Sequence, residues 1–276
     1  PGTKNIMLPW KDNDVLYRGD THAPLGLVSN DYKIVQPRTV MEFFRDVAKD
    51  NKLALETAGT LKGGRIYWAL AKLSEEAEVG KGDRMKGYVL LSTSADGSRR
   101  TRGKHTTVRV VCWNTLSMAD GNGKTTTGAG VNVSHRSIFD EKQAKIDLGL
   151  AEQSFDSFMK QARTLAKLKL TPKDAVNFTL QLLSGKLPTE LTKEETDEVL
   201  ATKHAQCIAA LYAGQGKGSQ LATAHGTAWG LVNAVTEFVD HAYPSRSIEN
   251  RLYRSWFGNS ERMKNDALNI AMAMAA

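Results

Sequence analysis

The hydrophobic residues of this chain change their spacing once, near Phe139, and this change constrains the fold more than any other feature. Before it, segments such as Leu53 to Leu61 and Thr106 to Trp113 alternate apolar with polar residues or are rich in β-prone types. From Asp140 onward, apolar residues recur at the three- and four-residue spacing of helices. We therefore expect an α+β protein: an N-terminal antiparallel β-meander packed with helices, followed by an all-helical C-terminal part.

The expected elements can be placed along the chain. Two short strands, 25–29 and 32–35, enclose a turn at Asn30-Asp31, and a helix with an apolar stripe follows from Pro37 to about Asp50. The meander has strands at 53–61, 65–73, 86–95 and 106–113, and helices are expected at 140–168, 174–183, 193–212, 221–241, 247–257 and 260–274. We divide the chain into a 1–138 α+β unit and a 139–276 helical region for packing or oligomerisation. The pattern fits two separate domains as well as one shared core.

Positive charge is concentrated in one part of the chain. The formal net charge is +7, and residues 60–136 hold 13 Lys and Arg against 6 Asp and Glu, so the rest of the chain is neutral. Four of these cations, Arg99, Arg100, Arg102 and Lys104, stand between two expected strands and would cap a β-hairpin. Such a cluster is the electrostatic footprint of a nucleic-acid-binding protein, although it equally suits a solubilising surface.

We expect this hairpin and its neighbours to neutralise phosphates along a groove lined by the sheet. Arg109 is placed on the sheet face opposite the more apolar row of its strand. Tyr67 either stacks on a base or packs inside, whereas Trp68 and Trp113 are expected in the core. The candidate DNA-binding residues are Lys62, Arg65, Tyr67, Arg99, Arg100, Arg102, Lys104, His105, Arg109, Lys124 and Arg136.

The sequence contains no recognisable catalytic or cofactor motif. Gly121-Asn-Gly123-Lys124-Thr125 lacks the earlier glycine of a phosphate loop, because Met118 stands there, and the glycines of 214–218 follow a helix rather than a strand. His204 and Cys207 share a helical face and could hold a metal only if the fold brought His225 and His241 to them, so we expect packed side chains there. Cys112 and Cys207 are expected as buried thiols. We expect no cofactor, no metal and no enzymatic activity.

Membrane insertion is not indicated either. The longest apolar runs, such as Val108 to Cys112, are far too short to cross a hydrocarbon core of roughly 30 Å. The N-terminus has no apolar segment of signal-peptide type, so we expect a cytoplasmic protein.

Four segments give the chain a family resemblance over nearly its full length. They are Leu25-Gly-Leu-Val-Ser-Asn-Asp-Tyr-Lys-Ile-Val-Gln36, Glu56-Thr-Ala-Gly-Thr-Leu-Lys-Gly-Gly-Arg65, Thr107-Val-Arg-Val-Val-Cys-Trp-Asn-Thr-Leu116 and Gly226-Thr-Ala-Trp-Gly-Leu-Val-Asn-Ala-Val-Thr-Glu-Phe-Val-Asp-His241. With them the chain resembles a phage- and plasmid-borne family known as a domain of unknown function. That family implies no mechanism, but for a phage protein the location would be the host cytoplasm.

A weaker resemblance, in element order only, is to Rad-fifty-two-type annealing proteins and the related phage Red-beta proteins. The segments that carry it are the helix 39–50, the meander 53–113 and the helix 140–168. It implies a long hairpin and a basic groove that hold single-stranded DNA by its backbone. It also implies a ring or helical filament of identical subunits that works without nucleotide hydrolysis.

Three hypotheses follow. The leading one is a homo-oligomeric protein that binds single-stranded DNA and anneals strands in phage-type recombination, with a duplex as intermediate. The second is a structural or regulatory mobile-element protein whose basic hairpin binds a protein partner. The third is an enzyme with a deep pocket formed by scattered residues such as His105, Cys112, Asn114 and His135.

Overall fold

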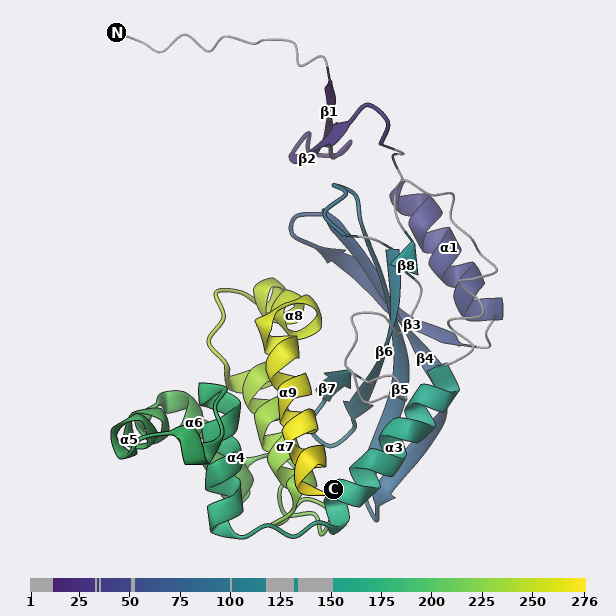
Figure 1. The fold of residues 1–276 in the computed structure, drawn as a ribbon. Helices are drawn as coiled ribbons and strands as arrows, with labels where there is room; N and C mark the ends of the chain where they lie inside the picture. The colour runs from purple at the N-terminus through teal and green to yellow at the C-terminus, as the bar shows by residue number, and fades with distance from the viewer. Residues whose placement is uncertain are drawn as a thin grey trace, which may run out of the picture.

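The computed structural model describes residues 12–32, 34, 36–50, 53–99, 101–117, 132–133 and 151–276. Within them the expected α+β class is confirmed: antiparallel strands dominate the N-terminal half and helices the C-terminal half (Figure 1). The strands are β1 (Asn13–Tyr17), β2 (Pro24–Ser29), β3 (Ala54–Leu61), β4 (Ile66–Gly80), β5 (Asp83–Ser94), β6 (Thr101–Arg109), β7 (Asn114–Ser117) and β8 (Asn132–Val133). The helices are α1 (Pro37–Asp50), α3 (Ala151–Lys167), α4 (Pro172–Ser184), α5 (Lys193–Ala201), α6 (Lys203–Ala210), α7 (Ala228–Glu237), α8 (Ile248–Phe257) and α9 (Asn259–Met274).

The main sheet is an antiparallel meander in the order β3-β4-β5-β6-β7, with β8 paired to β6. Its longest strands, β4 and β5, are joined by a tight turn at Lys81-Gly82, where Gly82 has a φ of 81°. The turns at the opposite end, between β3 and β4 and between β5 and β6, lie next to each other, because Ile66 pairs with Ser94. We refer to this end as the hairpin-tip end of the sheet.

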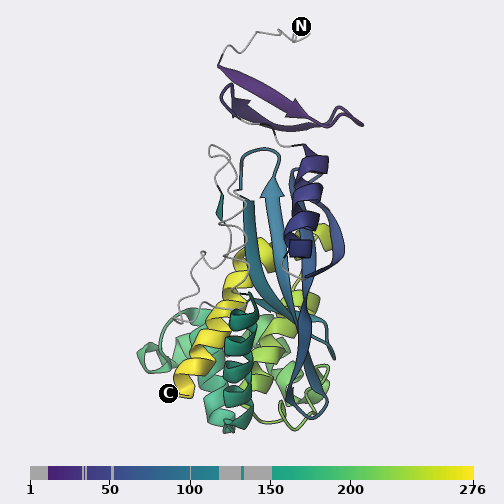
Figure 2. The same ribbon diagram turned by 90° about the vertical axis from the view of Figure 1, so that its right-hand side faces the viewer.

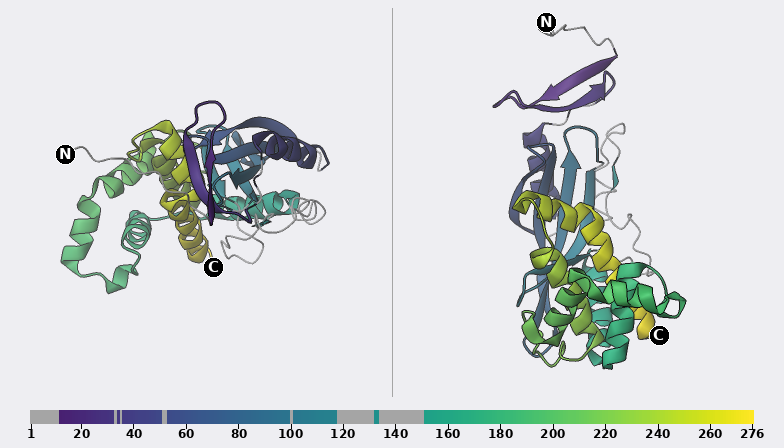
Figure 3. Two further views of the ribbon diagram at one scale, coloured as in Figure 1. Left: turned by 90° about the horizontal axis from the view of Figure 1, so that it is seen from above. Right: turned by 90° about the vertical axis from the view of Figure 1, so that its left-hand side faces the viewer.

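Helices cover both faces of the main sheet (Figures 1 and 2). On one face, Phe44 of α1 and Phe155 of α3 are buried in a cluster with Ala69 and Val89 of the sheet. On the other face, Trp256 of α8 packs edge-on against Trp68, with ring centroids 4.8 Å apart. Helices α4 to α6 lie beyond α7 and α9, away from the sheet (Figure 3). A charged side chain on a central strand is enclosed wherever these helices cover it, and there it has to find a partner.

The strands β1 and β2 form a separate two-stranded sheet above the hairpin-tip end (Figure 2). Its Leu16, Leu25 and Val28 form a small apolar cluster with the partly buried Tyr32 and Ala95. The prediction that strand 25–29 pairs with 32–35 is wrong, since its partner is the preceding segment 13–17.

Several element boundaries differ from expectation. The last expected strand, 106–113, is replaced by β6 ending at Arg109 and β7 beginning at Asn114, so Trp113 lies in the turn between them. Trp113 has a φ of 59° and is 64% exposed, which corrects its placement in the core. The expected helix 193–212 is divided at Thr202, whose side chain caps α6, and helix α7 begins at Ala228 rather than at 221. Residues 140–150 of the expected helix 140–168 lie outside the described residues.

One apolar core joins the two halves of the chain. Its buried members include Phe44 and Val89 from the N-terminal half and Phe158, Trp229 and Leu268 from the C-terminal half. Among the described helices, none has the length and apolar content needed to span a membrane.

Candidate nucleic-acid interface

The β3–β4 turn presents two exposed cations at the hairpin-tip end. Lys62 and Arg65 flank Gly63-Gly64, and the Arg65 guanidinium makes no hydrogen bond or ion pair within the described part of the chain. Gly64 has a φ of 95°, and an added Cβ would come within 2.9 Å of the Arg18 guanidinium. The turn is thus tight enough to need glycine at position 64, and it places Lys62 and Arg65 at the same hairpin tip.

Helix α8 supplies aromatic rings against these tips. The Lys62 ammonium donates to Asn250 at 2.9 Å and lies 4.4 Å from the centre of the Tyr253 ring. The Arg99 guanidinium donates to the Tyr253 hydroxyl at 2.8 Å and lies 4.6 Å from the centre of the Phe257 ring. We call Lys62, Arg65, Arg99, Tyr253 and Phe257 the hairpin-tip surface. The two rings were not found by sequence reasoning, because they lie more than 150 residues from Arg99 along the chain.

The rest of the basic cluster is arranged differently from expectation. Arg102 and Lys104 are residues of strand β6, both half-buried, rather than of the turn. Lys104 forms an ion pair with Glu261 of α9. Burial and the neighbouring cations Lys264, Arg102 and Arg99 lower the pKa of Lys104 to about 7. Lys104 therefore joins the hairpin to α9 through Glu261.

Arg109 is buried, 1% exposed, which corrects its assignment to a basic sheet face. Its guanidinium donates to the two carboxylate oxygens of Asp83 at 2.6 and 2.9 Å. The same carboxylate accepts bonds from Thr223 and from the Trp229 indole. Arg109 does lie on the sheet face opposite the apolar row of its strand, as expected. Because helices and loops cover both faces of the sheet here, Arg109 is enclosed and cannot reach a phosphate in this conformation.

His105 is also a correction, because it is buried on β6. Its Nδ1 lies 2.9 Å from the Ser154 hydroxyl of α3, which joins that helix to the sheet. Three further candidates, Arg100, Lys124 and Arg136, lie outside the described residues.

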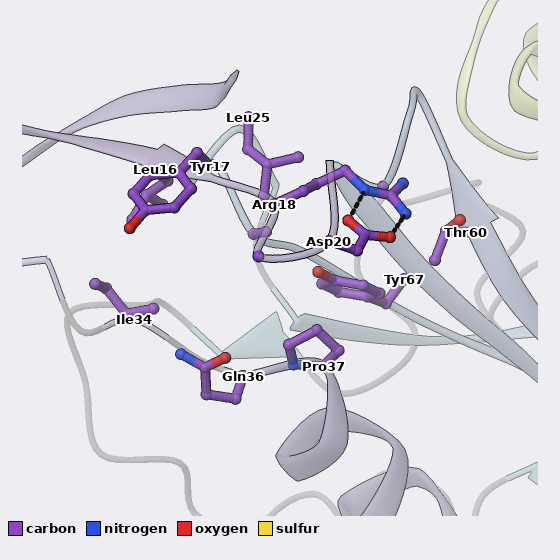
Figure 4. A pocket seen from close by; sticks show the side chains of 13 residues that line it. Leu16, Tyr17, Arg18, Asp20, Leu25, Ile34, Gln36, Pro37, Thr60 and Tyr67 are labelled. Carbon is purple, nitrogen blue, oxygen red and sulfur yellow. Dashed lines mark hydrogen bonds and ion pairs between the residues drawn. The ribbon is translucent and has the colours of Figure 1, made fainter. Parts of the chain in front are cut away.

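Tyr67 is 7% exposed and lines a cavity of about 380 Å³ at the hairpin-tip end (Figure 4). The cavity lies between the β1–β2 hairpin, the start of α1 and the β3–β4 turn. Above Tyr67, the Arg18 guanidinium donates to both carboxylate oxygens of Asp20, at 2.8 and 2.6 Å, and to the carbonyl of Gly63. Burial raises the pKa of Tyr67, so its hydroxyl stays protonated and can donate a hydrogen bond.

A buried polar network lies farther along the sheet, where β7 meets α8 and α9. The Lys264 ammonium, fully enclosed, donates to Asp240, Ser255 and Thr115 at 2.8 to 2.9 Å. A lysine beside a serine resembles a nucleophile and its base, but the Ser255 hydroxyl donates to Asp240 and is itself buried. The arrangement therefore joins β7, α8, α9 and the segment 238–242 that follows α7, and its Lys264 and Ser255 side chains are buried.

The residues named in the enzyme hypothesis each have a role in the fold rather than in a common pocket. Asn114 is buried and donates to the Asn233 carbonyl and the Thr236 hydroxyl of α7. Burial raises the pKa of the Cys112 thiol to about 11, which keeps it protonated. His135 lies outside the described residues. Among the residues described, no group of three His, Cys, Asp or Glu side chains is placed to hold a metal, and His204 stacks with Phe238 and Tyr243.

Comparison with known proteins gives one match. A family model described as a domain of unknown function (DUF932) matches residues 24–256. Searches of curated proteins and of solved structures found no match. The resemblance to Rad-fifty-two-type annealing proteins is not shown by these comparisons and stays a prediction.

Proposed function

Because the chain belongs to the DUF932 family, whose function is unknown, its role must be inferred from its own residues, and we propose that it binds nucleic acid without enzymatic chemistry. The observation that supports this is the hairpin-tip surface. Two cations from two hairpin turns, Lys62 and Arg99, meet two aromatic rings of α8 there, and the exposed Arg65 stands on the same turn as Lys62. Cations that track a phosphate backbone beside rings on which bases stack are the two components of single-strand binding sites.

The partners of these cations favour a role in binding. The Lys62 ammonium is oriented by two neutral groups, the Asn250 amide and the Tyr253 ring. A neutral partner fixes the direction of a cation without cancelling its charge, so the charge stays available to a phosphate. Lys104, by contrast, is opposed by Glu261. Glu249 is the acidic group next to Lys62, and its carboxylate accepts the Lys62 and Gly63 backbone N–H groups.

In the finer form of the proposal, the ligand is single-stranded DNA and the result is strand annealing. Backbone contacts leave the base edges exposed, so a second strand can test for complementarity and form a duplex. A homo-oligomeric ring or helical filament would continue the hairpin-tip surface from subunit to subunit along the strand. Positioning and charge neutralisation suffice for this activity, and the role fits recombination in a phage or mobile element within the cytoplasm of its host.

The test is a titration of labelled single strands and duplexes at several salt concentrations. The variant combines Lys62→Ala, Arg65→Ala and Arg99→Ala. A control combines Arg38→Ala, Arg45→Ala and Lys186→Ala, which removes the same charge from exposed positions elsewhere. We expect only the first triple to bind more weakly, with the salt slope falling by about 0.7 for each phosphate that is no longer neutralised. Equal affinities of the two triples, or binding insensitive to salt, would overturn the proposal.

Annealing has its own measurement. Complementary strands are mixed with and without the protein, and duplex formation is followed by energy transfer between end labels. We expect faster duplex formation with the protein than with naked DNA and a particle larger than one subunit in light scattering. A rate equal to that of naked DNA would reject annealing, and selective binding to an acidic protein instead of DNA would favour the regulatory hypothesis.

A further inference from the structure

The cavity beside Tyr67 shares the β3–β4 turn with the hairpin-tip surface. Thr60 and Gly64 line the cavity, and Lys62 and Arg65 stand on the same turn. A strand that contacts these two cations therefore passes next to the cavity. Its volume of about 380 Å³ is at the small end of the range for ligand pockets, which suits one ring system with its sugar.

The cavity wall has the composition of a site for a planar, partly polar ligand. Tyr17 and Tyr67 contribute aromatic rings, and Leu25, Ile34 and Pro37 contribute apolar surface. Figure 4 shows the Tyr67 hydroxyl pointing into the cavity from the sheet side. This hydroxyl makes no hydrogen bond within the described residues, although the side chain is more than nine-tenths buried. The hydroxyl is thus open to the cavity, where it can donate to an acceptor that a ligand supplies.

The charges at the cavity favour an uncharged ligand group over an anion. The Nε and Nη2 of Arg18 donate to the two carboxylate oxygens of Asp20, so the pair carries no net charge. A phosphate would have to displace the Asp20 carboxylate or lie beside it. The Gln36 amide offers both a donor and an acceptor at the start of α1, and Thr60 adds a hydroxyl. Donors and acceptors around an aromatic wall match the edge and the face of a nucleobase.

We propose that this cavity receives one unstacked base of the bound strand, while the adjoining phosphates stay outside on Lys62 and Arg65. This inference rests on the proposed function and names the part of the ligand that the site recognises. The Tyr67 hydroxyl donates to an acceptor on the base, and the Gln36 amide lies at its edge. The strand is thereby fixed at one point in each subunit, and the neighbouring bases remain available for pairing.

The experiment uses the full chain and a single strand that carries 2-aminopurine, whose fluorescence is quenched by stacking and rises when the base leaves the stack. We expect binding to raise this signal. We also expect the affinity for a strand with abasic sites to be at least about fivefold lower than for the intact strand, since stacking of one base contributes about that factor or more. The variant Tyr67→Phe removes only the hydroxyl. We expect it to reduce both the rise in 2-aminopurine fluorescence and the affinity ratio between intact and abasic strands. Gln36→Ala is expected to reduce the same two quantities.

Tyr212→Phe is the control of the same chemical change, because the Tyr212 hydroxyl likewise makes no hydrogen bond within the described residues but lies between α6 and α7, far along the chain from the cavity. Equal binding of intact and abasic strands by the unmodified protein, with unchanged 2-aminopurine fluorescence, would overturn the inference and leave strand binding intact. If no strand binds, the proposed function fails. Deoxyadenosine is then titrated alone: binding that Tyr67→Phe weakens would keep the cavity as a nucleoside site, and absence of binding would reject it.

Discussion

The ion pair between Arg109 and Asp83 is the most deeply buried charge interaction of the sheet among the described residues. Both side chains are essentially inaccessible, and Asp83 also accepts bonds from Thr223 and Trp229. Such a pair contributes little over an apolar replacement of both partners, but removal of one partner leaves a charge without compensation. Arg109 thus acts on stability, and the sequence pattern alone could not separate it from the surface arginines.

Arg109→Met is expected to lower the free energy of unfolding by about 3–5 kcal/mol, because Asp83 then stays buried without its cation. Urea denaturation followed by circular dichroism measures the change. Arg84→Met is the control, since its side chain is mostly exposed and its contact with Glu76 is long; we expect a change within about 0.5 kcal/mol. A similar small effect at Arg109 would show that its ion pair does not stabilise the fold.

The lowered pKa of Lys104 makes the stability of the fold depend on pH. Its pKa of about 7 in the folded protein lies below the value of about 10.4 for an unfolded lysine, so the unfolded chain binds more protons between these values. Stability should therefore rise as the pH increases from about 7 toward 10. In Lys104→Met this rise should be smaller, and urea midpoints of both proteins across this window measure it. Parallel curves would contradict the prediction, because carboxylates ordinarily titrate far below this window and add no slope there.

At the scale of elements, helix α8 holds the two hairpin tips together. Trp256 is buried against Trp68, and a small apolar cluster adds Leu61, Ile66 and Leu90 from the sheet. The cations on the solvent side of this contact depend on it for their positions. Stability and strand binding should consequently be linked through α8.

Trp256→Ala is expected to destabilise the protein by about 3–5 kcal/mol, because apolar burial is reduced and a cavity is left behind. Trp113→Ala provides a control of the same residue type, because Trp113 is mostly exposed and its removal should change stability by less than about 1 kcal/mol. Thermal unfolding of the two variants distinguishes them. If both are destabilised equally, the turn at Trp113 has a packing role that its exposure does not indicate.

The sequence predicted the elements more completely than their contacts. Alternation and helical spacing located the meander, α1 and most of the C-terminal helices, because these periods follow from which side of an element is buried. The sequence pattern extended the basic turn too far along the chain, because Arg102-Gly103 has the composition of a turn. In the structure Gly103 pairs with Leu91 inside the sheet. The contact of Arg99 with Tyr253 joins distant segments, and no local pattern encodes such a pair.

At the scale of the whole molecule, the chain has a core to which both halves contribute. Phe158 of α3 packs edge-on against Trp229 of α7, and the same cluster contains Phe44 and Val89 near the N-terminus. Neither half can bury these side chains without the other. The proposed binding surface has the same property, since its cations come from the sheet and its rings from α8.

Division of the chain into 1–138 and 139–276 is therefore expected to give two fragments that do not fold alone. Each separate fragment should lack a cooperative unfolding transition, because the apolar surface that its partner covers would face water. Mixing the two fragments should restore a single transition, followed by circular dichroism and by tryptophan fluorescence, to which Trp229 in the shared core contributes. A fragment that unfolds cooperatively by itself would mean that its half carries an independent core. The hairpin-tip surface would then lie between two domains, and a bound strand would hold them together.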